Sequence, residues 1–402
     1  MRKFIYIIII ITMAAVYCKA QIPKNDHLFD TVFVDTFDGS TLKTNKWQPM
    51  YQWGQFWRSN KTPSDTDQWC RDVDVAGMSF DPTDTNNRKI SGGTCKMIGK
   101  KQDTLMERWY WNPAWIIDTI PFKYTNAMLW SKASFKFGYF EIRFRMPNYT
   151  PSIYNRFSPT FWLWYRSDDV PWSEIDIFEI DGTLSSQNFT NNIWIDTTNT
   201  ADDELSLPLP TSQIPSINIS NWHTAAVNWT PNYIDFYLDS ALVRRVQHSA
   251  LKNLIEMPMI IENGVPGTNF CKGLGILDSI NTNLPVTYEI DYVKVWQPLC
   301  ACSNSYSSCS ITESTYVSKI YKDISLGGSG CSATFNNKTA FSIVADDFVL
   351  LNEGFEVGTN INLTIDVQPY CSDSIKFHNR TFTPAPEPID FNQNYNSKHN
   401  PN

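Results

Sequence analysis

One run, from Trp172 to Glu179, constrains this chain more than any other feature. It reads Trp-Ser-Glu-Ile-Asp-Ile-Phe-Glu and places three carboxylates among apolar side chains. Apolar residues at this density predict a buried or half-buried strand, in which successive side chains point to opposite faces. Glu174 and Asp176 would therefore share one face of the strand. Strict alternation would put Glu179 on the apolar face, where an ionised carboxylate is costly to bury.

One extra residue in this strand would return Glu179 to the face of the other two carboxylates. A β-bulge near Ile177 and Phe178 has this effect. Carboxylates crowded on one face raise one another's pKa, so one of them can stay protonated near neutral pH. A carboxylate beside a carboxylic acid is what retaining glycoside hydrolysis requires. An edge strand with solvated acidic side chains is the alternative, and the flanking aromatic residues favour the first interpretation.

The same run resembles the signature strand of family 16 glycoside hydrolases, in the variant with one extra residue before the second glutamate. Further segments resemble that family in the same order, and the likeness extends from about residue 30 to residue 297. These segments are residues 137–147, residues 221–224 with residues 234–239, and residues 288–296. The resemblance implies an all-β catalytic domain, an antiparallel β-sandwich of the jelly-roll type.

The resemblance also implies a role for each carboxylate. Glu174 would attack the anomeric carbon as the nucleophile, and Glu179 would protonate the leaving oxygen and then deprotonate the incoming water. Asp176 would hydrogen-bond to Glu174 and keep the two glutamates in different protonation states. Retention requires the two catalytic carboxyl groups about 5–5.5 Å apart. No cofactor is implied for catalysis. The family often holds a structural calcium ion, and Asp291 occupies a matching position.

The expected activity is that of a secreted, endo-acting retaining β-glycanase. A β-1,3- or mixed-linkage glucan is the favoured substrate, and a galactan (agar, porphyran or carrageenan) is the alternative. Pro171-Trp172 resembles the flank in bacterial mixed-linkage glucanases, whereas Trp172-Ser173 is similar to the Tyr-Ser of κ-carrageenases. Residues 169–173 depart from the Trp-Pro-x-x-Gly pattern of laminarinases. Transfer to a sugar acceptor instead of water would use the same residues.

A non-catalytic carbohydrate-binding protein on the same sandwich is the alternative from another class. Known relatives of that kind have lost one or both glutamates, whereas this chain keeps Glu174, Asp176 and Glu179. The sequence therefore favours an enzyme.

Aromatic residues supply candidate sugar contacts. The chain has 15 tryptophans, and the flat apolar face of tryptophan suits stacking on a pyranose ring. Filling of the sandwich core is the alternative for many of them. The residues expected to bind substrate are Trp172, Trp162, Trp164, Trp194 and Asn263, the last in a turn-like Glu-Asn-Gly sequence.

The first residues of the chain indicate export. Residues 1–20 combine Arg2 and Lys3 with an apolar stretch and end in Cys-Lys-Ala, which is typical of a signal peptide. The apolar stretch is short for a membrane span, and no later segment is expected to cross a bilayer. We therefore expect a secreted protein, extracellular or periplasmic, with no membrane association after cleavage.

Residues 21–299 contain short strand-like runs separated by turn-forming residues, with no long helical pattern, as expected of an antiparallel sandwich. Residues 300–371 predict a small cysteine-rich β module that resembles a stacked-strand module of exported bacterial proteins. Residues 372–402 read as a disordered tail. An even number of cysteines in an exported chain suggests disulfides, with many possible pairings. Those that remain after signal removal are Cys70, Cys95, Cys271, Cys300, Cys302, Cys309, Cys331 and Cys371.

Net charge narrows the range of partners. The chain has 33 basic and 41 acidic residues, and removal of Arg2, Lys3 and Lys19 with the signal peptide makes it more acidic still. This balance argues against nucleic acid as a partner and, more weakly, against a heavily sulfated polysaccharide. The expected partner is a polysaccharide substrate, bound by a monomer.

Overall fold

The computed structural model describes residues 28–49, 76–79, 83–111, 115–148, 158–167, 170–180, 189–196, 204–207, 217–264, 284–308, 320–326, 333–335, 340–351, 355–357, 362–367 and 370. Strands dominate these ranges, and their helical content is one 3-10 helix, η4 (Ser249–Asn253). No helix among the described residues has the length and apolar character needed to cross a membrane. The predicted signal peptide and the predicted tail lie outside the described residues.

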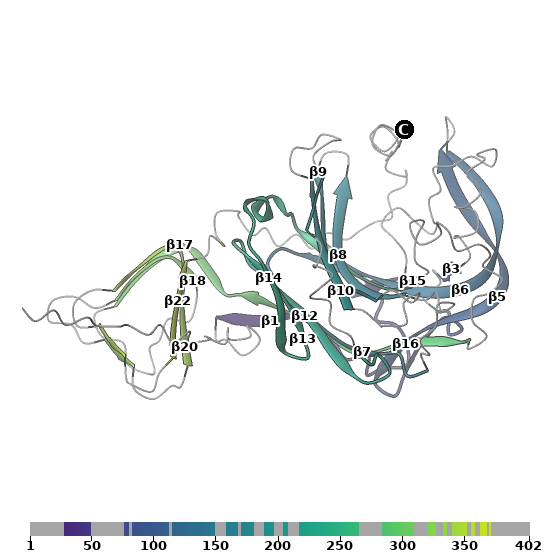
Figure 1. Ribbon diagram of the computed structural model, residues 1–402, viewed down its shortest axis with the longest axis horizontal. Coiled ribbons are helices and arrows are strands. Elements are labelled where there is room, and N and C mark those ends of the chain that lie inside the picture. Colours follow the sequence, from purple (N-terminus) through teal and green to yellow (C-terminus); the bar gives the residue numbers. More distant parts are fainter. Residues whose placement is uncertain are drawn as a thin grey trace, which may run out of the picture.

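The main body is a sandwich of two curved layers built from one continuous 16-stranded sheet (Figure 1). Strands of the first layer, in spatial order, are β11 (Glu204–Ser206), β10 (Phe189–Asp196), β9 (Val170–Ile180), β8 (Ser158–Ser167), β15 (Met257–Gly264) and β6 (Trp115–Phe135). Two short strands, β2 (Trp47–Gln48) and β3 (Ala76–Ser79), also pair with β6. Apart from the parallel β3, neighbouring strands of this layer are antiparallel.

The second layer continues from β6 through its long antiparallel neighbour β5 (Thr94–Trp111). Its other strands, in order, are β16 (Val286–Pro298), β7 (Gly138–Arg145), β12 (His223–Trp229), β13 (Ile234–Leu238) and β14 (Ala241–Val246). The strands β1 (Phe29–Asp35) and β4 (Arg88–Ser91) pair with β16 and β5. The predicted antiparallel β-sandwich is confirmed.

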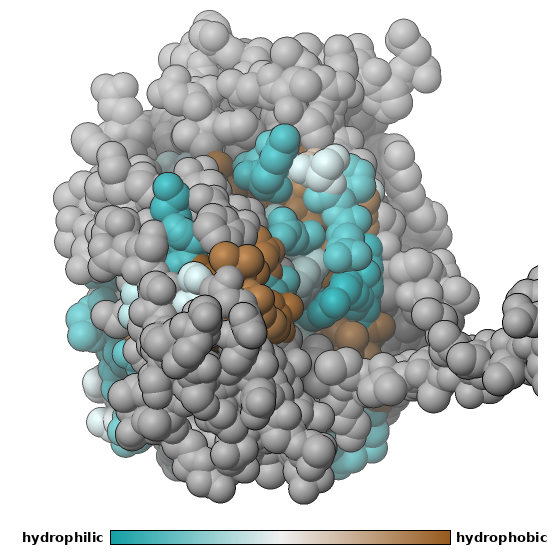
Figure 2. All heavy atoms as spheres, turned by 90° about the vertical axis from the view of Figure 1, so that its left-hand side faces the viewer, coloured by the Kyte–Doolittle hydropathy of each residue, from teal (hydrophilic) through white to brown (hydrophobic). Residues whose placement is uncertain are grey.

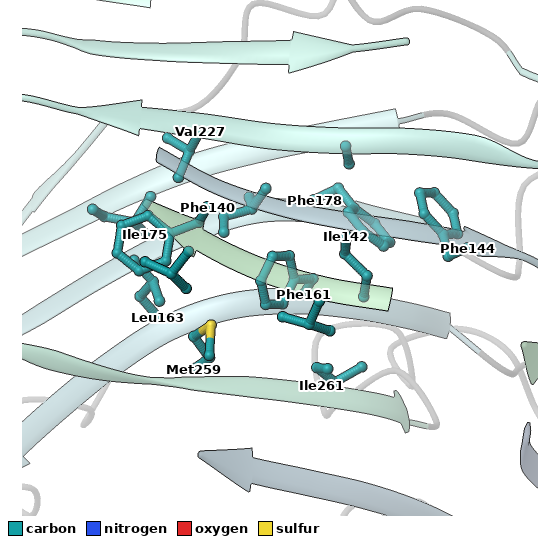
Figure 3. Packing of buried hydrophobic residues seen from close by; sticks show 14 of the residues in the cluster. Phe140, Ile142, Phe144, Phe161, Leu163, Ile175, Phe178, Val227, Met259 and Ile261 are labelled. Carbon is teal, nitrogen blue, oxygen red and sulfur yellow. The ribbon is translucent and has the colours of Figure 1, made fainter. Parts of the chain in front are cut away.

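The hydrophobic core lies between the two layers. Alternate residues of β7 (Phe140, Ile142 and Phe144) point toward residues of the first layer such as Phe161 and Leu163 (Figure 3). All five are fully buried. Each layer buries one face in this core, which fixes the position of the first layer against the second. The opposite face of the first layer does not take part in the core.

A glycine begins β7 because no other residue fits there. Gly138 has a φ of +126°, a backbone conformation that L side chains rarely adopt. A Cβ atom at this position would lie 2.4 Å from the carbonyl oxygen of Trp296 on β16. The Phe-Gly sequence that starts this strand thus permits β7 and β16 to approach closely.

A second, smaller unit follows β16. Its sheet consists of β17 (Cys300–Ser308), β18 (Ile320–Leu326), β20 (Ala340–Leu351) and β22 (Asn362–Val367), all paired in parallel. The strands β19 (Ala333–Phe335) and β21 (Phe355–Val357) form a separate parallel pair. These strands pair in parallel with one another along the small unit. The unit lies at the end of the molecule beside β1 (Figure 1).

The small unit packs against the sandwich through several contacts. Ile320 and Tyr370 are buried as part of the sandwich core, and the Tyr370 ring meets the Phe137 ring edge to face at 5.5 Å. The side-chain amide of Asn232 donates to the carbonyl of Val367. Seen from the side of the small unit, the surface of the molecule carries hydrophobic residues next to hydrophilic ones (Figure 2).

The expected disulfides are contradicted at one cysteine. Cys95 is a buried free thiol in the sandwich core, and burial raises its pKa to about 12. The expectation that the even cysteine count suggests is therefore wrong for Cys95, which forms no disulfide. The predicted disulfides of the small unit stay a prediction, since most of its cysteine side chains lie outside the described residues.

Candidate active site

The acidic run occupies β9, and the register of β9 contains the expected bulge. On β8, Phe161 is opposite Phe178 and Trp162 is opposite Asp176, so Ile177 is left without a residue opposite it. On β10, the single residue Asn191 spans the same interval. The prediction of a bulge at Ile177 and Phe178 is confirmed.

The bulge separates the apolar from the acidic side chains of β9. Ile175, Ile177 and Phe178 are fully buried in the core between the layers, and Figure 3 shows Ile175 and Phe178 there. Glu174 is partly exposed and Glu179 is exposed. Two consecutive core residues, Ile177 and Phe178, therefore replace strict alternation and leave Glu179 on the side of the other carboxylates.

Asp176 is the buried member of the acidic set, with 3% of its surface exposed. Burial raises the pKa of its carboxyl well above the usual value, and the charges of Glu174 and Glu179 raise the pKa further. A side-chain hydrogen bond with Glu174 acts in the same direction, because the protonated Asp176 donates it. The three groups thus interact electrostatically, and their interaction together with burial favours the protonated form of Asp176.

Tryptophans flank these carboxylates on both sides. Trp164 on β8 and Trp194 on β10 are both directly opposite Glu174, and Trp162 is opposite Asp176. Directly opposite residues on neighbouring strands share a face of the sheet. Three of the four predicted tryptophans therefore lie on the face of the acidic residues. The fourth, Trp172, is in β9, but its side chain lies outside the described part of the structure.

The tryptophans differ in what they offer a ligand. Trp164 is only 7% exposed and meets both Trp130 and Trp162 in edge-to-face contacts, with ring centroids 6.0 and 6.4 Å away. Trp162 is partly exposed, and its indole nitrogen is buried without a hydrogen-bond partner. The side chain of Trp194 forms a hydrogen bond with Asp176, which lowers the pKa of Asp176.

Asn263 differs from the prediction in its setting. It belongs to the strand β15 and not to a turn, and it is fully buried. Its side-chain nitrogen and oxygen have no hydrogen-bond partner, while its main-chain carbonyl accepts from the amide of Asn126. A role of Asn263 in sugar binding stays a prediction.

Three residues of this face, Thr160, Glu262 and Trp130, were not anticipated from the sequence. Thr160 on β8 is opposite Glu179 on one side and opposite Glu262 on β15 on the other. Glu179, Thr160 and Glu262 form one row across the sheet. Trp130 on β6 lies two strands beyond Trp162, with Ile260 between them. Alternation within Ile-Ile-Glu-Asn could have indicated Glu262, but the pairing of distant strands is not visible in the sequence.

The expected calcium position lies on the other layer. Asp291 on β16 forms an ion pair with Arg143 on β7. Within the described ranges, no group of three or more His, Cys, Asp and Glu residues is arranged to hold a metal ion. The Arg143 guanidinium already supplies Asp291 with a positive charge. Calcium binding at Asp291 stays a prediction.

The sequence around this site is similar to known proteins. The model of the glycosyl hydrolases family 16 matches residues 84–271, which include β9. A kappa-carrageenase from Pseudoalteromonas carrageenovora is 24% identical over 227 residues, or 52% of this chain and 56% of that protein. A beta-glucanase from Acetivibrio thermocellus is 28% identical over 177 residues, or 44% of this chain and 47% of that protein. This chain thus spans about half the length of the curated relatives it matches.

Among solved structures, the crystal structure of LamAcat from Zobellia galactanivorans matches with a TM-score of 0.48 and 20% identity. That match covers 66% of this chain and 97% of the solved one. Residues 84–271, which carry the acidic strand β9, are thus similar to the glycosyl hydrolases of family 16.

Proposed function

We propose that this protein is an exported, endo-acting retaining β-glycanase. The observation that supports this proposal most is the bulge in strand β9. It places Glu174, Asp176 and Glu179 on the face opposite the apolar core, in which Ile175, Ile177 and Phe178 are buried. The likeness of the residues around this strand to family 16 supports the same proposal.

The proposed mechanism gives each carboxyl group a protonation state that its surroundings favour. Asp176 keeps its proton and donates it in a hydrogen bond to Glu174, which stabilises Glu174 as the ionised nucleophile. Glu174 attacks the anomeric carbon and forms a glycosyl ester, while Glu179 protonates the departing oxygen. Glu179 then removes a proton from water, and attack by that water releases the sugar with its original configuration.

The favoured substrate is a β-1,3- or mixed-linkage glucan, and a galactan is the second candidate. Curated relatives include a beta-glucanase and a kappa-carrageenase, so both classes occur among similar proteins. Trp162 and Trp194 are the described residues proposed to contact sugar rings, because each is partly exposed on the face of the carboxylates.

The remaining proposals concern the parts around the site. The catalytic unit would comprise residues 21–299 and the small β unit residues 300–371, because strand pairing of the 16-stranded sheet ends with β16. Export by a cleaved signal peptide, action as a monomer and a structural calcium at Asp291 complete the proposal.

Substrate screening with stereochemical analysis tests this function. Purified protein is incubated with laminarin, lichenan, agarose, porphyran and carrageenans, and the products are sized. Proton NMR of the first products then identifies the anomer. We expect oligosaccharides of intermediate size with retained β configuration from one of the two glucans. Binding without cleavage would favour a carbohydrate-binding protein, and an α product would contradict retention.

A further inference from the structure

An arginine connects the two layers of the sandwich beside the bulge of β9. Arg244 on β14 is opposite Phe236, a core residue of β13, so it is on the core face of its strand. Its Nη1 donates to the side-chain oxygen of Asn191 on β10 at 2.9 Å, and its Nη2 donates to the main-chain carbonyl of Leu207 at 2.8 Å. Leu207 directly follows β11, and its main-chain N–H donates to the carbonyl of Ile193 on β10 at 2.9 Å. We call the two bonds of Arg244 the Arg244 clamp.

Asn191 is a polar residue at a core position of β10. It is 2% exposed, and its neighbours on the same face of the strand, Phe189 and Ile193, are fully buried core residues. Arginine can only donate hydrogen bonds, so the Asn191 atom that contacts Arg244 must be the amide oxygen. The amide nitrogen is buried without a hydrogen-bond partner. An apolar residue would avoid the cost of burying this nitrogen, so the bond to Arg244 is what the asparagine contributes.

The position of Asn191 coincides with the bulge. It is the one residue of β10 that spans the two bulge residues of β9. The residue before it, Thr190, is opposite Glu179, and the Thr190 hydroxyl donates to the main-chain carbonyl of Glu179 at 2.7 Å. A series of hydrogen bonds and adjacent residues therefore leads from Arg244 on β14, through β10, to the segment of β9 that carries Glu179.

Glu174 lies outside this arrangement. It precedes the bulge and pairs directly with both neighbouring strands, opposite Trp164 on β8 and Trp194 on β10. Glu179 follows the bulge, so its place relative to Glu174 depends on which residues of β9 form the bulge. A shift of register by one residue turns a side chain to the other face of the strand. The segment that carries Glu179 therefore needs a fixed bulge, and the segment that carries Glu174 does not.

We propose that Arg244 is a positioning residue, which holds β10 through Asn191 and thereby fixes the bulge that sets Glu179 in place relative to Glu174. This inference rests on the function proposed above, in which Glu179 is the acid and base. Loss of the clamp leaves Glu174 in position and lets Glu179 depart from its productive geometry. Protonation of the leaving group then becomes slower, whereas attack by the nucleophile is unaffected.

Arg244→Met tests the clamp, because it keeps a long side chain and removes its donors. We compare kcat/KM for the polysaccharide that the enzyme cleaves with kcat/KM for a dinitrophenyl glycoside of the released oligosaccharide, whose leaving group needs little protonation. We expect a loss of about tenfold to a hundredfold on the polysaccharide. On the dinitrophenyl glycoside we expect a loss of less than about twofold. Equal losses on both substrates, or no loss on the polysaccharide, would overturn the proposal.

Two variants of Asn191 test whether Arg244 acts through this residue. Asn191→Leu removes the acceptor and fills the core position with an apolar side chain, so it should fold and should reproduce the substrate dependence of Arg244→Met. Asn191→Asp keeps an acceptor for the guanidinium and should behave like the wild-type protein on both substrates. Wild-type rates in Asn191→Leu would overturn the proposal, as would equal losses on the polysaccharide in Asn191→Asp and Asn191→Leu.

Arg245→Met is the matched control. Arg245 is the next residue of β14, and its guanidinium bonds to Asp235 on β13, within the second layer. Its loss should lower stability without changing the ratio of kcat/KM between the two substrates, measured at a temperature at which every variant is folded. A change of that ratio as large as in Arg244→Met would overturn the proposal, because it would indicate a general loss of rigidity.

Hydrogen exchange separates this proposal from the proposed function, since it needs no substrate. Mass spectrometry should detect faster amide exchange in residues 176–179 and 190–193 of Arg244→Met than in the wild-type protein, and no change there in Arg245→Met. Unchanged exchange of these residues in Arg244→Met would overturn the clamp, whatever the activity of the protein. Faster exchange in a protein that cleaves no glycan would overturn the proposed function, and with it the catalytic role of the clamp, but not the clamp itself.

Discussion

Phe178 on β9 stacks on Phe144 on β7 across the core, with ring centroids 4.4 Å apart and ring planes inclined by 15°. Phe178 is the residue at which the bulge of β9 returns to normal register, and it directly precedes Glu179. The stack therefore connects the second layer of the sandwich to the position of the proposed acid and base.

Substitution of this ring should affect catalysis as well as stability. Phe178→Leu should reduce the free energy of unfolding by about 1–3 kcal/mol, because it replaces a stacked ring in a packed core. It should also lower kcat, because Glu179 loses the support of the residue before it. Phe140→Leu, a substitution of an equally buried ring on β7, is the control for stability alone. If both variants lost the same fraction of kcat, the bulge would have no special role in placing Glu179.

Gly138 offers a test of the sandwich itself. Gly138→Ala should destabilise the protein by more than about 2 kcal/mol, because the new Cβ would lie 2.4 Å from a main-chain oxygen at a φ of +126°. Gly92→Ala is a matched control, since Gly92 also has a positive φ but nothing within 4 Å of a Cβ. Its cost should be about 1–2 kcal/mol. Urea unfolding measures both, and equal losses would contradict the close approach of β7 and β16.

Buried Asp176 predicts a dependence of stability on pH. Its pKa is raised in the folded protein, mainly by burial, so the folded state binds a proton that the unfolded state releases above its ordinary pKa. The free energy of unfolding should therefore fall as pH rises above about 4 on account of this group. Asp176→Asn removes this contribution and should become more stable relative to wild type between pH 5 and pH 8.

Asp235→Asn provides the contrast. Asp235 is fully buried and forms two short hydrogen bonds with the guanidinium of Arg245, so its ionised form is paired. We expect Asp235→Asn to destabilise the protein at both pH values, because it removes the negative charge and one of the two acceptor oxygens that face Arg245. Urea unfolding of both variants at the two pH values is the measurement. A stabilisation by Asp176→Asn that does not change with pH would contradict a proton held by Asp176.

The small β unit should contribute to stability and not to the chemistry. Truncation after Leu299 removes Ile320 and Tyr370 from the core and exposes the ring of Phe137. We expect a lower melting temperature but unchanged kcat on soluble oligosaccharides, because β9 and its neighbours are retained. Tyr370→Ala should reproduce part of the loss of stability, by about 2–4 kcal/mol. A folded but inactive truncated protein would show that the unit belongs to the active site.

Local patterns in the sequence predicted much of the fold. Apolar side chains at high density predicted β9 as a strand, and three carboxylates that conflict with strict alternation predicted the bulge at Ile177 and Phe178. Both predictions depend on properties of one strand, namely side-chain direction and the cost of burying charge. Short runs between turns predicted the strands of the small unit, whereas their stacking was implied only by a resemblance to a module of exported bacterial proteins.

Relationships between distant strands were not accessible in this way. The bond from Trp194 to Asp176 depends on the register of β9 and β10, and the row of Glu179, Thr160 and Glu262 depends on three strands. Asn263 was expected in a turn because its neighbours suit one, but pairing with β8 extends β15 through it. The even cysteine count failed for Cys95, because a buried thiol packs as a small apolar group.

Trapping of the covalent intermediate tests the central claim most directly. A 2-deoxy-2-fluoro glycosyl fluoride of the cleaved sugar slows both steps, but its good leaving group permits the first, so the glycosyl ester accumulates. Proteolysis and mass spectrometry then locate the sugar. We predict a single adduct on Glu174 in the wild-type protein and none in Glu174→Gln. An adduct on Asp176 or Glu179, or turnover of the natural substrate by folded Glu174→Gln at a wild-type rate, would contradict the assignment of Glu174 as the nucleophile.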